Sequence, residues 1–237
     1  MPTKQKSPTA KRRLLIVDDH PIMRQGLAQL INNEPDLVVC CEAATAGEAL
    51  AAIAGGPPDL VLADLSLPDK GGLELIKDIQ ALHAGLPVLV LSMHDEAIYA
   101  ERVLRAGARG YIMKQEGAAK VMAGIRQVLN GQVCVSEKMS ARILDIFSGR
   151  RTANTRSPVE RLTDREFEVF ELLGQGKGSR QVAEQLHLSI KTVEVHRANI
   201  KQKLQLKTAP ELIRYAVRWV ETQEPKSLGL AIPASKQ

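Results

Sequence analysis

The chain has 237 residues, of which 44% are hydrophobic and 25% are charged, and its formal net charge is +5. These values are typical of a soluble globular protein and exclude a chain that is disordered over most of its length. Aromatic residues make up only 3% of the chain, so we expect its cores to be aliphatic.

The charge is distributed unevenly along the chain. Residues 1–13 carry five Lys or Arg and no acid, residues 14–150 carry a net charge of −5, and residues 151–237 carry +5. An acidic body followed by a basic part indicates two domains, the second facing a polyanion. We interpret residues 1–11 as a disordered basic tail. No apolar stretch suits a secretory signal or a membrane span, so we expect a cytoplasmic protein without a membrane partner.

Short aliphatic runs alternate with amphipathic stretches over residues 12–131. The runs predict strands at 14–17, 37–43, 59–64, 86–92 and 108–113, and the stretches between and after them predict helices at 21–33, 45–54, 72–83, 95–106 and 116–130. Five strand–helix units in sequence predict an α/β fold, with a doubly wound five-stranded parallel sheet covered on both faces. Cys40 and Cys41 are adjacent in the second run, so we expect their side chains on opposite faces of that strand.

The pattern changes after this domain. Residues 132–160 are polar and basic towards their end, which is typical of a linker, with a possible short helix at 136–147. Residues 161–221 have helical periodicity throughout and predict a small all-α domain. Residues 222–237 contain Pro, Gly and Ser, and we expect a flexible tail.

Chemically active side chains stand where the predicted strands end. Asp18 and Asp19 end the first strand, Asp64 ends the third, Ser92 ends the fourth, and Lys114 follows the fifth. The first, third and fourth strands can be neighbours in such a sheet, where ligands bind at the carboxyl ends of the strands. Three adjacent carboxylates need a cation, and hard oxygen ligands suit Mg²⁺. The grouping predicts a carboxylate that accepts a phosphoryl group with the help of a metal.

These residues stand in four short segments, VDDHPIMRQGL, DLSLPDKGG, LSMHDE and GYIMK. The segments resemble the receiver domain of two-component response regulators of the NarL/FixJ class, and the resemblance covers nearly all of residues 12–130. It implies a flavodoxin-like fold in which Asp64 accepts the phosphoryl group and Lys114 pairs with its charge. Ser92 and Tyr111 are the implied switch residues. The implied Mg²⁺ ligands are Asp18, Asp19, Asp64 and the backbone carbonyl of Ser66.

The helical domain opens with a capping box formed by Thr163 and Glu166. A short helix follows, and then a third helix that is capped by Ser189 and rich in Lys, Arg, His and Asn. Two short helices joined by a tight turn indicate a helix-turn-helix, although a solvated charged surface has the same composition. Residues 162–217, including QVAEQLHLSIKTVEVHRANIKQKL, resemble the LuxR-type helix-turn-helix.

This second resemblance implies binding to double-stranded DNA. The implied contacts are Lys191, Thr192, Glu194, Val195, Arg197, Lys201 and Lys203. Thr192 and Lys203 are expected at phosphates, and Glu194, Val195 and Arg197 at base edges. A glutamate at a base edge accepts a hydrogen bond from cytosine.

Together the resemblances imply a DNA-binding response regulator rather than an enzyme, phosphorylated at Asp64 by a partner histidine kinase and controlling transcription. The last helix presents Leu212, Ala216 and Trp219 or Val220 to a partner or to the core, and a homodimer on DNA is expected. Two alternatives stay open. An aspartyl-phosphate enzyme commonly has a second Asp two residues after the nucleophile, where this chain has Ser66. A receiver that is only a dimerisation scaffold predicts equal operator affinity with and without a phosphodonor.

Overall fold

The computed structural model describes residues 11–148, 158–186 and 188–223. The chain forms two compact units that divide mainly at Arg156 and Ser157. The tail expected at residues 1–11 lies outside the described residues except for its last position. The tail expected at 222–237 lies outside them from residue 224 onward. No helix in the described part of the chain is long and apolar enough to cross a bilayer.

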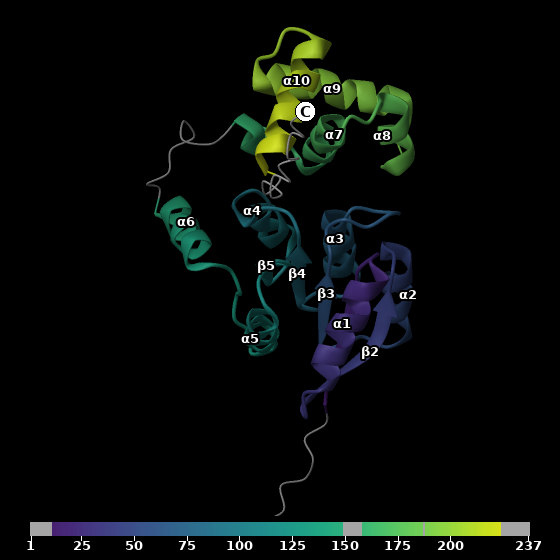
Figure 1. Cartoon of the computed structure of the whole chain (residues 1–237), viewed down its shortest axis with the longest axis vertical. Coiled ribbons are helices and arrows are strands. Elements are labelled where there is room, and N and C mark those ends of the chain that lie inside the picture. Colours follow the sequence, from purple (N-terminus) through teal and green to yellow (C-terminus); the bar gives the residue numbers. More distant parts are fainter. Residues whose placement is uncertain (1–10, 149–157, 187, 224–237) are drawn as a thin grey trace, which may run out of the picture. The chain divides into compact units, whose positions relative to one another are not determined.

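The first unit contains one sheet of five parallel strands, as the sequence predicts (Figure 1). The strand order is β2-β1-β3-β4-β5, so the first, third and fourth strands are neighbours. The strands are β1 (Arg12–Val17), β2 (Leu37–Ala43), β3 (Leu60–Ala63), β4 (Val88–Ser92) and β5 (Gly110–Met113). Every residue of β3 and β4 is buried, because these strands lie inside a sheet that is covered on both faces.

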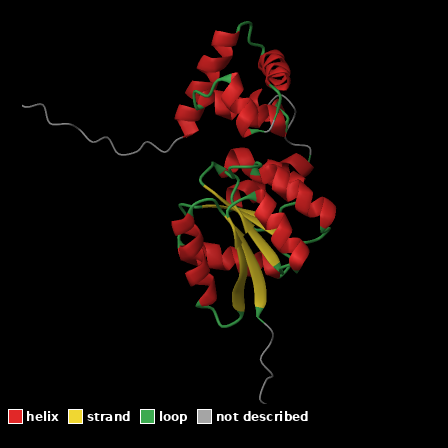
Figure 2. Cartoon of the chain, turned by 90° about the vertical axis from the view of Figure 1, so that its right-hand side faces the viewer, coloured by secondary structure: helices red, strands yellow, loops and turns green. Residues whose placement is uncertain are grey.

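Helices flank both sides of this sheet (Figure 2). They are α1 (Pro21–Asn32), α2 (Ala46–Gly55), α3 (Gly72–Leu82), α4 (Glu96–Ala106) and α5 (Ala118–Leu129). Helices α1 and α5 bury Ile31 and Ile125 in a cluster with Leu14 and Ile16 of β1. Leu15, between these two β1 positions, is also buried but lies outside this cluster, as expected of a strand whose successive side chains alternate between faces. The predicted doubly wound architecture is confirmed.

A short segment after α5 borders the outer edge of β5. Cys134 is buried, forms an isolated parallel bridge with Gly110, and accepts a hydrogen bond from the Tyr111 N–H at 2.8 Å. Helix α6 (Glu137–Phe147) follows, close to the short helix expected at 136–147. Arg142 of α6 donates to the Ala97 carbonyl of α4 at 2.7 Å, so this part of the segment packs on the first unit.

The strand β2 contains an irregularity at Cys40. Its register against β1 shifts, because Leu14 pairs with Val39 and Leu15 with Cys41, which leaves Cys40 as an extra residue. Such a bulge breaks the alternation of faces. The placement of Cys40 and Cys41 on opposite faces assumed a regular strand, and at this bulge it stays a prediction.

The second unit is helical, as predicted. It contains the 3₁₀ turn η2 (Pro158–Arg161) and the helices α7 (Asp164–Gly174), α8 (Ser179–Gln185), α9 (Ile190–Leu204) and α10 (Ala209–Gln223). The capping box of Thr163 and Glu166 is present, and Ser189 caps α9. Both caps satisfy backbone N–H groups that the first helical turn leaves unpaired.

Helix α10 packs its apolar face onto α7. Leu212 and Ala216 are fully buried, and the Trp219 ring meets Phe167 and Phe170 edge-on at centroid distances of 5.4 and 5.5 Å. The sequence left open whether this face serves a partner or the core, and the structure places it in the core.

Candidate functional site

Asp64 lies directly after β3 at the carboxyl edge of the sheet. The register places Val17 opposite Ala63, so the residues that follow, Asp18 and Asp64, emerge side by side. The Asp64 N–H donates to the Val17 carbonyl at 2.8 Å, which fixes this alignment. Both carboxylates are buried, with 2% of Asp18 and 3% of Asp64 exposed. The two acids that the sequence predicted to converge therefore lie together.

Lys114 bridges these two carboxylates. Its Nζ lies 2.7 Å from Asp18 Oδ2 and 2.7 Å from Asp64 Oδ2, and all three side chains are 3% exposed. The Lys114 N–H donates to the Ser92 carbonyl at 2.7 Å, so the end of β4 sets the position of the lysine. A single ammonium in this place offsets one of two buried negative charges.

The pKa values of the pair follow from this geometry. Burial raises the pKa of Asp64 above its ordinary value, although the hydrogen bond from Lys114 acts in the opposite direction. Burial alone would lower the pKa of Lys114, but hydrogen bonds to Asp18 and Asp64 raise it overall. The lysine therefore stays charged at neutral pH.

Four possible metal ligands meet at this edge. Asp18, Asp19, Asp64 and His20 offer ligand atoms that all lie within 4.8 Å of one another. Asp19 Oδ1 is buried without a well-aligned hydrogen bond among the described residues, although His20 Nδ1 lies 2.6 Å from it. Three hard carboxylates at one edge of the sheet fit the ligand preference of Mg²⁺. Sequence reasoning gave His20 no role and did not place it against both neighbouring acids.

Arg24 of α1 is a second residue that sequence reasoning missed. Its guanidinium donates to the Asp18 carbonyl oxygen at 2.5 Å, so it holds the backbone of the acidic pair. The sequence did not predict this contact, because an arginine in the first turn of a helix is common on any solvent-facing helix surface.

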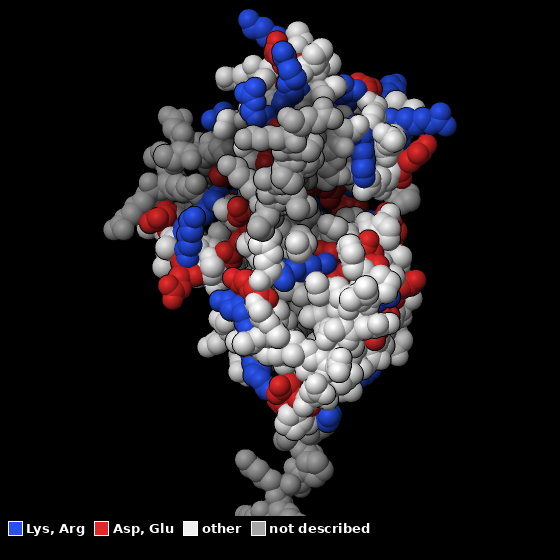
Figure 3. All heavy atoms as spheres, viewed as in Figure 1, with Lys and Arg blue, Asp and Glu red and all other residues white. Residues whose placement is uncertain are grey.

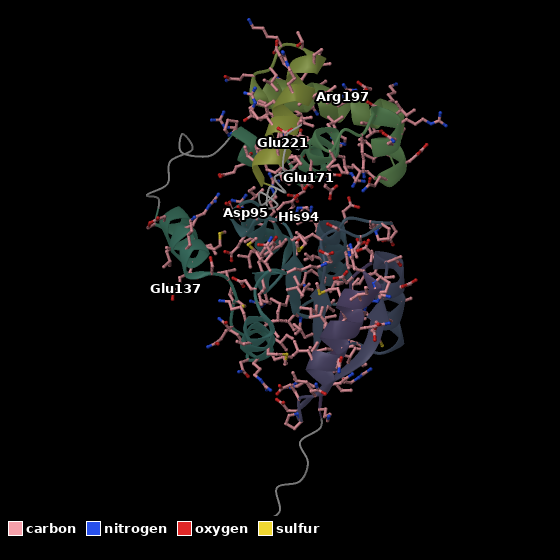
Figure 4. All side chains as sticks on the ribbon, viewed as in Figure 1. His94, Asp95, Glu137, Glu171, Arg197 and Glu221 are labelled. Carbon is pink, nitrogen blue, oxygen red and sulfur yellow. The ribbon has the colours of Figure 1, made fainter. Side chains whose placement is uncertain are left out.

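The predicted switch residues lie at the ends of β4 and β5. Ser92 is completely buried, and its Oγ accepts a hydrogen bond from the His94 N–H at 3.2 Å. Tyr111 is 2% exposed and donates its hydroxyl to the His94 carbonyl at 2.7 Å. Figure 4 labels His94 and Asp95 in this connection between β4 and α4. The Tyr111 ring is therefore already turned inward, and burial raises the pKa of its phenol.

The loop after β3 carries Ser66 and is anchored at two points. The Gly72 N–H donates to the Leu65 carbonyl at 2.9 Å, which closes the loop. The Asp69 carboxylate accepts hydrogen bonds from the N–H groups of Ala46 and Gly47 at 2.9 Å each, at the start of α2. Ser66 itself is exposed, and its hydroxyl lies 3.1 Å from His94 Nε2. The sequence gave no sign of the Asp69 anchor, because its partners are backbone groups 23 and 22 residues away in the chain.

In the second unit, basic side chains gather over the helices (Figure 3). Lys191 and Val195 are exposed on α9, while Lys201 is half-buried. Thr192 exchanges a hydrogen bond with Ser189 at 2.8 Å. Lys203 Nζ lies 2.6 Å from Glu166 Oε2 in the capping box of α7, a contact that sequence reasoning missed. The predicted DNA-contact residues are thus all on α9, and four of them, Thr192, Glu194, Arg197 and Lys203, have side-chain partners within the unit.

A parallel α/β unit with a buried acidic edge, joined to a helix-turn-helix unit, defines a receiver-type DNA-binding regulator. Residues 14–126 match the response regulator receiver domain family, and residues 160–216 match the luxR family of bacterial regulatory proteins. The oxygen regulatory protein NreC of Staphylococcus aureus is 36% identical over 210 residues, which cover 87% of this chain and 97% of that protein.

Solved structures show the same architecture. A two-component response regulator of the LuxR family from Aurantimonas sp. SI85-9A1 is 34% identical, with a TM-score of 0.54, over 59% of this chain and 99% of that one. RcsB from Salmonella enterica serovar Typhimurium, bound to the rprA promoter with a phosphomimetic, is 24% identical with a TM-score of 0.65, over 87% of this chain and 98% of that one. The latter similarity concerns the fold alone.

The chain belongs to the two-component response regulators of the NarL/FixJ type, which join a receiver domain to a LuxR-type DNA-binding domain. The family resemblance drawn from the sequence is confirmed.

Proposed function

We propose that Asp64 is the phosphoacceptor of this regulator and that a partner histidine kinase supplies the phosphoryl group. The observation that carries the proposal is the buried Asp64 carboxylate, with Lys114 Nζ at 2.7 Å from its Oδ2. An Asp64 oxygen forms the new O–P bond, the P–N bond of the kinase phosphohistidine breaks, and the freed imidazole keeps the electron pair. Lys114 then pairs with the added negative charge.

The metal ligands of the proposal are Asp18, Asp19, Asp64 and the backbone carbonyl of Ser66. When bound, Mg²⁺ supplies positive charge that offsets the transferring phosphoryl oxygens. The protein holds these ligands through Arg24 on the Asp18 carbonyl and through the Asp69 anchor on the loop that carries Ser66. These contacts support a ligand set whose backbone is already in place before phosphorylation.

The same proposal assigns Ser92 and Tyr111 to the switch. Ser92 accepts a hydrogen bond from the His94 N–H, and Tyr111 donates to the His94 carbonyl. When the Ser92 hydroxyl turns towards a phosphoryl oxygen, it loses its hydrogen bond with the His94 N–H. The connection between β4 and α4 then changes its conformation. A ligand or modification shifts such an equilibrium only through contacts that differ between the two states.

A phosphorylation assay tests the acceptor. Wild-type protein incubated with acetyl phosphate and Mg²⁺ gains one phosphoryl group by intact mass spectrometry, and Asp64→Asn gains none. Asp78→Asn is the matched control, because Asp78 forms a surface pair with Lys70. Equal incorporation into Asp64→Asn contradicts the assignment. Sustained hydrolysis of a phosphomonoester by the wild type favours the enzyme alternative instead.

For the second unit, we propose that α9 binds double-stranded DNA and that the active receiver promotes binding as a homodimer. The residues assigned to DNA are Lys191, Thr192, Glu194, Val195, Arg197, Lys201 and Lys203. Two observations support a dimer through α10: Ile213 is 40% exposed, and a groove of about 450 Å³ borders Tyr215 and Trp219. We take residues 12–131 and 161–221 as the two domains, with residues 132–160 as the connection between them.

A further inference from the structure

A polar network joins the start of α8 to the exposed side of α9. The Ser179 hydroxyl donates to Glu194 Oε1 at 2.6 Å. Arg197 Nη1 donates both to Ser179 Oγ at 2.6 Å and to Glu194 Oε1 at 2.8 Å. Hydrogen bonds thus join three side chains from the two helices of the helix-turn-helix. Figure 4 labels Arg197 within the second unit.

The exposures of the two charged residues differ. The Arg197 side chain is only 17% exposed, while that of Glu194 is 53% exposed. An arginine that reads guanine presents its planar fork freely to the base edge. Arg197 is instead drawn back against Ser179 and Glu194. Both hydrogen bonds to the glutamate go to Oε1, and Oε2 accepts none from the described residues. The unused acceptor of the network therefore belongs to Glu194.

The network also keeps Glu194 ionised and reduces the repulsion between its carboxylate and DNA phosphates. The Ser179 hydrogen bond and the positive charge of Arg197 lower the pKa of Glu194, so its carboxylate stays ionised and can only accept. An isolated carboxylate is repelled by DNA phosphates. The positive charge of Arg197, whose Nη1 lies 2.8 Å from Glu194 Oε1, offsets that repulsion while the ion pair stays intact.

We infer that Glu194 is the residue of α9 that sets base specificity, by accepting a hydrogen bond from the N4 amino group of cytosine, and that Ser179 and Arg197 are positioning residues. This inference rests on the proposed binding of DNA by α9. In the major groove, cytosine presents an amino donor without an acceptor on the same base. Adenine also presents an amino donor, but its adjacent N7 lone pair repels a carboxylate. An acceptor-only group therefore prefers cytosine.

The alternative reading makes Arg197 the base reader and Glu194 only its partner in the free protein. The two hypotheses predict different losses of base preference when Ser179 or Arg197 is substituted. If Glu194 reads cytosine, loss of Ser179 or Arg197 weakens the same cytosine preference. If Arg197 reads guanine, its loss removes a guanine preference at a separate position.

The test uses the full-length protein with acetyl phosphate and Mg²⁺ at one fixed salt concentration. Selection from a randomised double-stranded DNA pool gives the preferred site, and fluorescence anisotropy on its single-base variants gives a preference at each position. We expect Glu194→Gln to reduce the cytosine preference at one position per half-site by roughly tenfold. Ser179→Ala and Arg197→Lys reduce the preference at that same position, and Ser179→Thr, which keeps the hydroxyl, retains it.

Glu184→Gln is the matched control, because Glu184 forms an exposed ion pair with Arg180 on α8. We expect this variant to keep the base preferences of the wild type. Circular dichroism checks that each variant is folded, and the two Ser179 variants decide the question if Arg197→Lys does not fold. Unchanged preferences in Glu194→Gln, or a lost guanine preference in Arg197→Lys, overturn the inference. A wild-type protein that enriches no site contradicts the proposed DNA binding itself, whereas a site without cytosine dependence contradicts only the role of Glu194.

Discussion

Lys114 pairs with two buried carboxylates, and its removal would take this positive charge away from both of them. Asp18 and Asp64 both approach its ammonium at 2.7 Å in a place almost closed to solvent. Taking one partner from a buried ionic group leaves uncompensated charge, which destabilises far more than the loss of a surface pair.

We expect Lys114→Met to lower the free energy of unfolding of the receiver by about 3–5 kcal/mol in EDTA. Mg²⁺ recovers part of the loss, because it supplies the missing positive charge to the acids. Lys70→Met is the control, since Lys70 pairs with Asp78 at the surface and should change stability by about 1 kcal/mol or less. Urea denaturation followed by circular dichroism measures both. Equal losses in the two variants argue against a special role for the buried bridge.

At the scale of the element, the loop after β3 depends on α2 for its position. The Asp69 carboxylate caps the first N–H groups of α2 from outside that helix. Burial acts to raise the pKa of Asp69, but hydrogen bonds from Ala46 and Gly47 lower it overall. A lowered pKa in the folded state means that this carboxylate stabilises the fold once it is ionised.

Asp69→Ala should lower the free energy of unfolding at pH 7 by about 1 kcal/mol, the usual effect of losing a helix cap, and should weaken Mg²⁺ binding. Asp69→Asn, which keeps one acceptor oxygen, loses less. The difference between wild type and Asp69→Ala is fully present above the unfolded pKa of about 3.9 and disappears as the pH falls through the lower folded value. Urea titrations from pH 2.5 to 7 measure it. A pH-independent difference contradicts the anchoring role.

The elements and the acidic site could be predicted from the sequence because each rests on a local pattern. Buried parallel strands appear as unbroken aliphatic runs, and strand ends place Asp18, Asp64 and Lys114 at one edge by topology alone. What could not be predicted depends on contacts between residues that are distant in the sequence. The register shift at Cys40, the Asp69 anchor and the contact of Lys203 with Glu166 all join residues without a shared sequence pattern. The contacts of Ser179 with Glu194 and Arg197 could not be predicted, because these partners are 15 and 18 residues further along the chain.

At the scale of the whole molecule, the two compact units predict that damage to one leaves the other intact. A Cβ on Gly72 would clash with the Asp64 carbonyl oxygen and lie 2.6 Å from the Leu65 Cα, and neither backbone atom can move without disturbing the loop. We expect Gly72→Ala to destabilise the receiver by about 1–3 kcal/mol. Hydrogen-exchange mass spectrometry should show faster exchange in peptides from residues 12–147 and unchanged exchange in those from 158–223.

Gly26→Ala is the matched control for that substitution. A Cβ at Gly26 has no neighbour within 4 Å, and alanine favours the interior of α1 by up to about 1 kcal/mol. Protection of the receiver should therefore stay the same or increase. Faster exchange across both units in Gly72→Ala goes against their independence.

The division of charge predicts how salt acts on DNA binding. Residues 151–237 carry a net charge of +5 and residues 14–150 carry −5, so the salt dependence should arise from the second unit. Lys191→Ala should reduce the slope of log affinity against log salt concentration by about one, the value for a single phosphate contact. Lys70→Ala, in the receiver, should leave the slope unchanged. Fluorescence anisotropy titrations at salt concentrations between about 50 and 200 mM measure these slopes. Identical slopes for wild type and Lys191→Ala remove Lys191 from the DNA contacts.

The two borders of the sheet bear on how this protein avoids self-association through its backbone. An open strand border offers free N–H and C=O groups to another chain, and proteins commonly block it with a bulge or a covering segment. Here the Cys134 segment pairs with the border of β5, and the extra residue at Cys40 interrupts the regular ladder of β2. Neither border offers a long, regular template for a foreign strand. Strand addition to the receiver and fibre growth through its sheet borders are therefore disfavoured.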